Sequence, residues 1–181
     1  MINANNTALI NKDRLRFTKN KLSSGLALLA IVLNALYFVD VYRSDVGSYY
    51  YNWIIGISVL YNLIFMLLAF LSSEGVKNYK LSYSYILILL GVCEIARIFI
   101  IPFTARNTTS PTITTDAVQE LISKGEPVPT VMGDFQFFFC SGCLAAAAVL
   151  LIISGIIAMI KTTTLMKYQA ELEKNAKGSK S

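Results

Sequence analysis

The sequence predicts an all-α integral membrane protein: a four-helix transmembrane bundle with both termini in the cytoplasm and a short helix in an outer loop. Of its 181 residues, 55% are hydrophobic and only 15% are charged, whereas soluble domains carry about 25% charged residues. The apolar residues are gathered in four blocks, and the basic residues lie mostly on one side of them. This pattern excludes an ordinary soluble domain, a disordered chain and a nucleic-acid module, so we expect a lipid bilayer and no nucleic acid among the partners.

Four segments are long and apolar enough to cross a bilayer, which takes about 20 helical residues. The first follows basic residues, as the apolar region of a signal peptide does. It is too long for that region, however, and no small-residue cleavage site follows it. We therefore interpret it as a retained span. The expected transmembrane domain covers residues 22–160, with spans at about 22–42, 53–71, 83–103 and 135–160.

Lysine and arginine are distributed unevenly around these spans. Twelve lie in the N-terminal tail, the loop between spans two and three, and the C-terminal tail; three lie in the two opposite loops. Because cytoplasmic segments carry the excess of basic residues, both termini are predicted to be cytoplasmic. The compact size and the lack of eukaryotic sorting features favour the plasma membrane of a bacterium, that is, its inner membrane.

Three segments lie outside the expected spans. Residues 1–21 form a basic tail, which either lies on anionic lipids as an interfacial helix or is a solvated tail that only sets topology. The outer loop, residues 104–134, is too long to be structureless. We expect it to hold a short helix on the ends of the bundle, capped by Asp116 and ended by Gly125. Residues 161–181 form a cytoplasmic tail, predicted helical from its Glu and Lys spacing.

Five polar side chains form a candidate intramembrane layer. Glu94 and Arg97 are spaced i,i+3 in span three. Asn34 and Asn62 fall at the depth of Glu94 when each helix is measured from its outer end at about 1.5 Å per residue. Asp40 lies nearer the outer end of span one, within reach of an outward-pointing arginine. The layer either neutralises its own charges and fixes helix register, or lines a path for a proton, an ion or a polar solute; the absence of broken spans and internal repeats favours the first interpretation.

Span four carries small residues at four-residue spacing, a pattern that lets helix backbones approach closely. The expected helix-packing face consists of Ser141, Gly142, Ala145 and Ala146. This face should contact another span or another subunit. We therefore expect association with other membrane subunits, or with a second copy, through span four.

The same span contains a C-x-x-C pair, Cys140 and Cys143. A four-helix membrane protein with such a pair resembles the thiol–disulfide oxidoreductases of the vitamin K epoxide reductase type. Those enzymes carry a second cysteine pair in an outer loop, and this chain has none there, because its third cysteine, Cys93, falls inside span three. The sequence therefore favours the two cysteines as small packing residues, with a redox pair as the alternative.

No other motif indicates chemistry. Histidine is absent, and the sequence contains no phosphate-binding glycine loop, metal-ligand cluster or nucleophilic arrangement, so we expect no catalytic residues, cofactor or metal. The sequence favours a non-enzymatic accessory or scaffold subunit of a larger membrane complex, one concerned with transport. The second hypothesis is a homo-oligomeric channel or transporter that uses the polar layer. The third is a membrane thiol oxidoreductase that uses the C-x-x-C pair.

Overall fold

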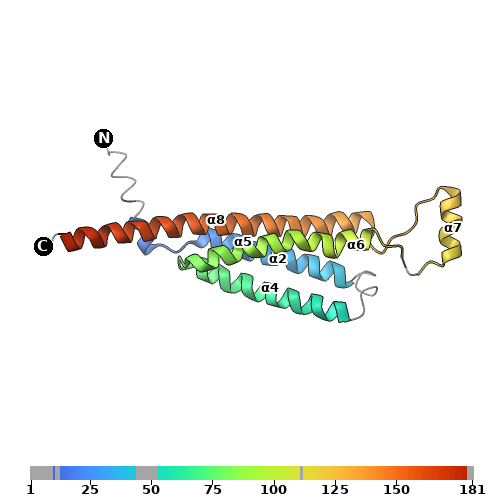
Figure 1. Ribbon diagram of the computed structural model, residues 1–181, viewed down its shortest axis with the longest axis horizontal. Helices are drawn as coiled ribbons and strands as arrows, with labels where there is room; N and C mark the ends of the chain where they lie inside the picture. The colour runs from blue at the N-terminus through green and yellow to red at the C-terminus, as the bar shows by residue number, and fades with distance from the viewer. Residues whose placement is uncertain (1–9, 11–12, 44–52, 111, 179–181) are drawn as a thin grey trace.

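A computed structural model describes residues 10, 13–43, 53–110 and 112–178, and these residues are almost entirely helical (Figure 1). Four helices are long and apolar enough to cross a membrane, which agrees with the predicted all-α class and with the number of apolar helices expected. The helices are α2 (Lys21–Arg43), α4 (Trp53–Lys77), α5 (Leu81–Ile100), α6 (Pro102–Arg106), α7 (Thr115–Lys124) and α8 (Asp134–Gly178). The start of the predicted basic tail, residues 1–9 and 11–12, and the loop 44–52 lie outside the described residues.

Helices α4 and α8 continue past the spans predicted from hydropathy, whereas α5 ends at Ile100, short of the predicted end at 103, and α6 follows it from Pro102. Helix α4 ends at Lys77, where the sequence predicted an end near Leu71. Ser72 and Ser73, which follow the apolar run, are buried within the bundle, so the helix continues to a short turn before α5. Helix α8 is a single helix of 45 residues, about 67 Å long at the usual rise per residue, and it extends beyond the other three (Figure 1).

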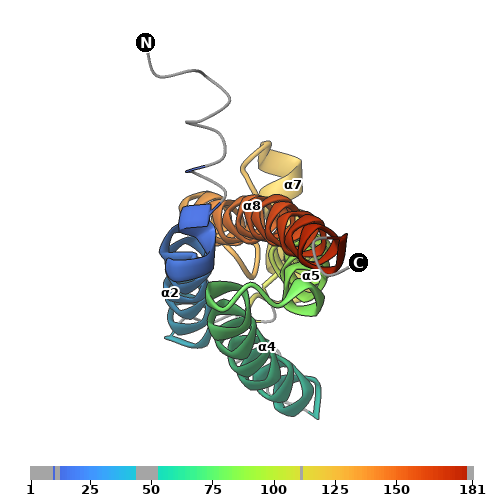
Figure 2. The ribbon, with the colours of Figure 1, turned by 90° about the vertical axis from the view of Figure 1, so that its left-hand side faces the viewer.

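Helix α8 occupies the centre of the packing scheme. It packs mainly against α5 and α2, whereas α4 packs against α2 and α5 and scarcely touches α8 (Figure 2). The largest fully buried side chains include Phe65 of α4, Leu87 of α5, and Leu144 and Leu151 of α8. Since lipid tails are as apolar as these side chains, apolar burial alone does not hold α4 in place.

Two glycines bring α5 and α8 into close contact. A Cβ atom on Gly91 of α5 would lie 2.6 Å from Ile152 Cγ1 and 3.0 Å from the carbonyl oxygen of Ala148. A Cβ atom on Gly155 of α8 would lie 2.6 Å from Ile88 Cγ1 and 2.8 Å from the carbonyl oxygen of Ser84. The two backbones therefore approach as closely as they do only because these positions lack a side chain.

Paired serines join α2 to its two neighbours at the end of the bundle where Lys77 and Lys161 lie, which we call the basic end. Ser23 Oγ donates to the Ser154 carbonyl at 2.6 Å, and Ser154 Oγ donates to the Ser23 carbonyl at 2.7 Å. Ser24 Oγ and Ser73 Oγ are 2.8 Å apart. Sequence analysis missed these contacts, because single serines near the end of a span carry no periodic signal.

Helix α8 contacts the residues just before α2 at the basic end. Lys161 Nζ donates to Asn20 Oδ1 at 3.1 Å, and the backbone N–H of Asn20 donates to the backbone carbonyl of Lys77 at 3.1 Å. Residues 13–17 are helical, and Phe17, the last of them, is 81% exposed.

The segment between α6 and α8 projects from the opposite end of the bundle. Its two arms pair through backbone hydrogen bonds from Ser110 to Pro129 (3.0 Å) and from Val131 to Thr108 (2.9 Å). Helix α7 at its tip has no buried residue and stands away from the bundle (Figure 1). The expectation that this helix rests on the bundle ends was therefore wrong, because the paired arms hold it off.

The ends of α7 match the sequence signals in part. Gly125 follows the helix with φ at 69° and donates to the carbonyls of Ile122 and Leu121, as expected for a glycine that ends a helix in the left-handed conformation. The N-cap is Thr114 and not Asp116, which instead lies in the first turn. There its carboxylate interacts favourably with the positive end of the helix dipole.

Gly155→Ala tests the close contact of α5 and α8. The added methyl group has no room beside the Ser84 carbonyl, so we expect the free energy of unfolding to fall by about 1–3 kcal/mol, although alanine favours helix more than glycine does. The measurement is the thermal midpoint of the helical circular dichroism signal in detergent. Gly56→Ala is the matched control, since no atom lies within 4 Å of a Cβ there. Equal midpoints for the two variants would contradict the contact.

Candidate polar site inside the bundle

The buried guanidinium of Arg97 lies at the centre of a polar cluster formed by three helices. Its Nη1 donates to Asn34 Oδ1 of α2 and to Asn62 Oδ1 of α4, both at 2.9 Å. Asn34 Nδ2 also donates to Asn62 Oδ1 at 2.8 Å. Arg97 is 4% exposed and both asparagines are fully buried, so the contacts connect α2, α4 and α5 away from lipid.

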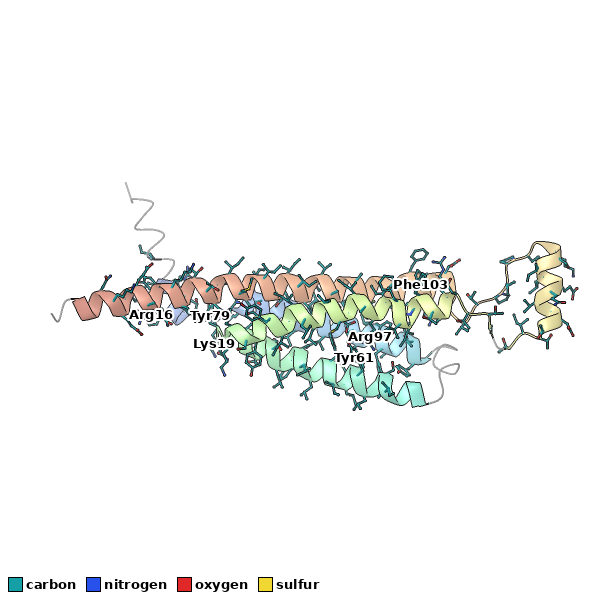
Figure 3. All side chains as sticks on the ribbon, viewed as in Figure 1. Arg16, Lys19, Tyr61, Tyr79, Arg97 and Phe103 are labelled. Atoms are coloured by element: carbon teal, nitrogen blue, oxygen red, sulfur yellow. The ribbon has the colours of Figure 1, made fainter. Side chains whose placement is uncertain are left out.

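Two tyrosine rings complete the surroundings of the guanidinium. The Arg97 Cζ atom lies 4.7 Å from the ring centroid of Tyr37 and 5.0 Å from that of Tyr61. Figure 3 shows Arg97 and Tyr61 close together where α5 meets α4. A cation held near aromatic faces within about 6 Å is stabilised by the ring quadrupoles, and more so away from water. Sequence analysis assigned no such role to Tyr37 or Tyr61.

Glu94 is less engaged than its neighbour. Its Oε1 lies 3.5 Å from Arg97 Nη1, which makes an ion pair of two buried groups. Neither carboxylate oxygen has a hydrogen-bond partner, and Asn62 Nδ2 and Tyr37 Oη are also without one. The positive charge of Arg97 is therefore compensated by two hydrogen bonds and an ion pair. Polar atoms of Glu94, Asn62 and Tyr37 around it remain without a hydrogen-bond partner.

The positions of Glu94 and Arg97 follow from helix periodicity. The buried residues of α5 recur every three or four positions, and the two charged side chains continue that buried face beyond Leu90 and Gly91. Helix α8 meets the same face with the apolar residues Leu144, Ala147 and Leu151. Among the described residues, the side chains that accept hydrogen bonds from the guanidinium come from α2 and α4.

Asp40 takes a partner other than Arg97. Its Oδ2 accepts a hydrogen bond from the Cys140 thiol at 3.2 Å. The structure thus brings together four of the five residues of the expected layer and pairs the fifth with α8. The contact between Asp40 and Arg97 considered from the sequence is replaced, because the two asparagines engage the guanidinium deeper in the bundle.

The cysteine pair faces inward. Cys140 is fully buried and Cys143 is 9% exposed, and both are free thiols. Disulfide exchange requires a thiol that a partner can reach, so this arrangement favours the packing interpretation. No group of three or more cysteine, aspartate or glutamate residues among those described could hold a metal ion.

The small-residue face of α8 points away from the other spans. Gly142, Ala145 and Ala146 are exposed, Ser141 is half-buried, and a Cβ atom on Gly142 would meet no atom within 4 Å. The inward face of the same helix uses Leu144, Ala147 and Ala148 instead, among other residues. None of the described spans covers the expected packing face.

We found no match to this chain among known protein families, curated proteins or solved structures. The functional argument therefore rests on the geometry of the bundle and its exposed surfaces.

Arg97→Met and Glu94→Met should differ in their cost. Loss of Arg97 removes a donor from two asparagines and strands a buried carboxylate, so we expect a loss of about 3–5 kcal/mol of stability. Loss of Glu94 leaves the guanidinium with both asparagines and both rings, so the cost should be clearly smaller. The thermal midpoint and the yield of monodisperse protein measure the difference.

The double variant completes this cycle. The double variant Glu94→Met with Arg97→Met leaves no unpaired buried charge, so it should be more stable than Arg97→Met alone. The side-chain oxygen Asn34 Oδ1 still loses the hydrogen bond from Arg97 in this variant. Simple addition of the two single effects would show that these charges are not coupled.

Proposed function

We propose that this chain is a non-enzymatic accessory or scaffold subunit of a larger membrane complex, one concerned with transport, in the plasma membrane of a bacterium. Arg97, Asn34 and Asn62 bond to one another across three helices, as expected of residues that hold helices together. The surfaces free to interact lie on the outside of the bundle and beyond its ends. A protein built this way acts by binding other molecules.

The observation that carries this proposal is the uncovered small-residue face of α8. A helix that packs only against lipid has no need of closely spaced small residues, whereas a helix–helix contact does. Gly142 and Ala146 lie one turn apart on this face, and both are exposed. A helix of another subunit would fit against them at short range.

Helix α7 offers a second contact region outside the membrane. Val118 and Leu121 are half-buried and Ile122 is 63% exposed on one side of this helix. An amphipathic helix normally covers its apolar stripe against another surface. Since α7 stands away from the bundle, a partner subunit is the natural cover.

The orientation follows from the basic residues. We propose that the basic end faces the cytoplasm, since the turn between α4 and α5 and both tails carry the excess of lysine and arginine. The segment that bears α7 would then lie outside the cell. The exposed Phe17 and the adjoining basic residues would lie on the anionic lipids of the cytoplasmic leaflet.

Cysteine labelling tests this orientation. Asn78 lies in the turn between α4 and α5, and Thr112 lies in the segment before α7; both are exposed. With the native cysteines replaced, an impermeant maleimide on intact cells should label Thr112→Cys, and it should label Asn78→Cys only after lysis. Labelling of Asn78→Cys on intact cells would overturn the orientation.

Gly142→Leu tests the α8 face. The position has open space around it, so the variant should fold with an unchanged thermal midpoint. It should nevertheless lose the co-purifying subunit, because a bulky side chain separates closely packed backbones. The measurement is mild-detergent purification followed by mass spectrometry and sizing of the complex.

Gly56→Leu is the matched control for this experiment. Gly56 of α4 is exposed and equally unobstructed, but it has no neighbouring small-residue face. Gly56→Leu should keep the co-purifying subunit, whereas Gly142→Leu should lose most of it. An intact complex with Gly142→Leu would contradict the proposed contact, and a pure homo-oligomer would favour self-association.

The unpaired atoms of Glu94 and Asn62 favour a second candidate, a homo-oligomeric channel or transporter. Unsatisfied polar groups inside a membrane protein mark many solute and proton paths. In a conducting layer, the double variant at Glu94 and Arg97 would assemble but lose flux. In a structural layer, it would assemble and keep the function of its complex.

A further inference from the structure

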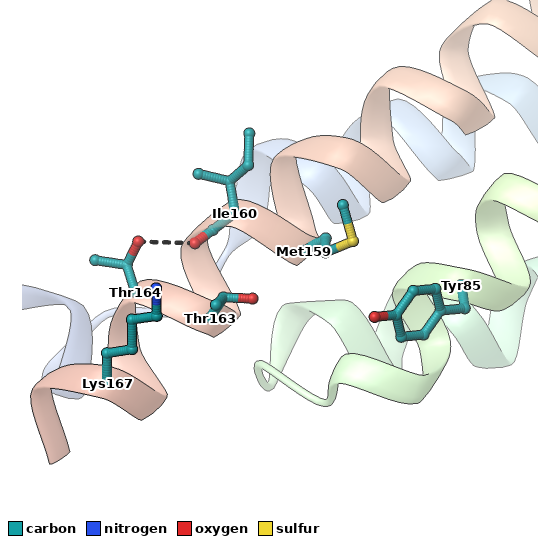
Figure 4. Close-up of a pocket in the computed structure, with 6 residues that line it drawn as sticks. All are labelled: Tyr85, Met159, Ile160, Thr163, Thr164 and Lys167. Carbon is teal, nitrogen blue, oxygen red and sulfur yellow. Dashed lines mark hydrogen bonds between the residues drawn. The ribbon is translucent and has the colours of Figure 1, made fainter. Parts of the chain in front are cut away.

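A pocket of about 330 Å³ lies between α8 and the first turns of α5, near the basic end (Figure 4). Tyr85 forms its α5 wall, and residues from Met159 to Lys167 form its α8 wall. Tyr85 is 56% exposed and Ile160 is 59% exposed, so the pocket opens on the outer surface of the bundle. The lining residues are Tyr85, Met159, Ile160, Thr163, Thr164 and Lys167.

The pocket has one polar half and one apolar half. In Figure 4 the hydroxyl groups of Thr163 and Tyr85 face each other across the space, and the Lys167 side chain runs back along α8 towards Thr164. Thr164 Oγ1 donates to the Ile160 carbonyl at 2.8 Å, which leaves Thr163, Tyr85 and Lys167 as the donors. Met159 and Ile160 provide the apolar half.

The pocket lies at the depth of lipid headgroups. The apolar run of α8 ends at Ile160, and Lys161 follows at once. Thr163 and Lys167 therefore lie about 4.5 Å and about 10.5 Å beyond the last residue of that run, at the usual rise per residue. Headgroup regions are about 5–8 Å thick on each side of the hydrocarbon, so the two halves match the two parts of a phospholipid.

The lining of the pocket carries one charge, the positive charge of Lys167. No acidic residue lines the pocket. Helix α5 begins at Leu81, one turn before Tyr85, and its N-terminus has no side-chain cap, so the positive end of its dipole lies near the pocket. Glu74, on the neighbouring α4, is paired with Lys77 at 2.7 Å.

From this arrangement we propose that the pocket binds the phosphate headgroup of an anionic phospholipid. Lys167, Thr163 and Tyr85 contact the phosphate, and one acyl chain lies along Met159 and Ile160. The apolar half favours a lipid over a free phosphate ion, which would leave that half empty. The lack of an acidic lining residue leaves a headgroup ammonium without an ion-pair partner, which favours an anionic headgroup over a zwitterionic one. This site does not depend on the function proposed above.

Native mass spectrometry of the full chain in detergent tests this proposal. The probes are phosphatidylglycerol and phosphatidylcholine with identical acyl chains, each titrated against the protein, with inorganic phosphate as competitor. The variants are Lys167→Gln, Thr163→Val and the matched control Lys174→Gln, which removes the same charge two turns further along α8. Lys167 and Lys174 are both exposed, and an unchanged sizing profile checks the fold of each variant.

We expect phosphatidylglycerol to bind more tightly than phosphatidylcholine. Lys167→Gln should weaken its binding roughly tenfold, the size typical of one lost contact to a charged group. Thr163→Val should weaken it less, and Lys174→Gln should have no effect. Equal losses in Lys167→Gln and Lys174→Gln would overturn the proposal in favour of diffuse attraction. Equal binding of the two lipids, or full displacement by inorganic phosphate, would also overturn it.

Discussion

The need to satisfy one buried guanidinium constrains the arrangement of three helices. A charged group inside a bilayer costs at least about 2.5–3.5 kcal/mol unless it is compensated. Single hydrogen bonds between membrane helices contribute about 0.6 kcal/mol on average. The penalty for misplacing Arg97 therefore outweighs the gain from any one bond it makes. Asn34, Asn62 and the two tyrosine rings must lie where they are, and α2 and α4 are placed with them.

Helix α8 is held by a different kind of contact. None of its described side chains hydrogen-bonds to Arg97, Asn34 or Asn62. It meets α5 through Gly91 and Gly155 and meets α2 through Ser23 and Ser154. In lipid no hydrophobic force drives helices together, so helix association depends on close backbone packing and on hydrogen bonds between helices. The bundle uses polar bonds to attach α4 and close packing to attach α5 to α8.

This division explains what the sequence could predict. Hydropathy predicts the spans, because each must cover the hydrocarbon with apolar residues, and helix spacing places Asn34, Asn62 and Glu94 at one depth. Hydropathy cannot show which side of α8 faces lipid, since its Ala145 and Ala148 are equally apolar although only Ala148 is buried. Nor can it assign partners: Asp40 pairs with Cys140 because of how α2 and α8 cross, which no single span encodes.

The same contacts determine where interactions with other molecules can occur. Side chains that cross-link the helices are unavailable to a partner, and the apolar flanks of α2 and α4 suit lipid without further specificity. What distinguishes the outer surface is a short list: the small-residue face of α8, the apolar stripe of α7, and the pocket beside Lys167. These features lie at three different positions along the bundle (Figure 1). The partner subunit that we propose for the first two and the lipid that we propose for the third would therefore occupy separate surfaces of the chain.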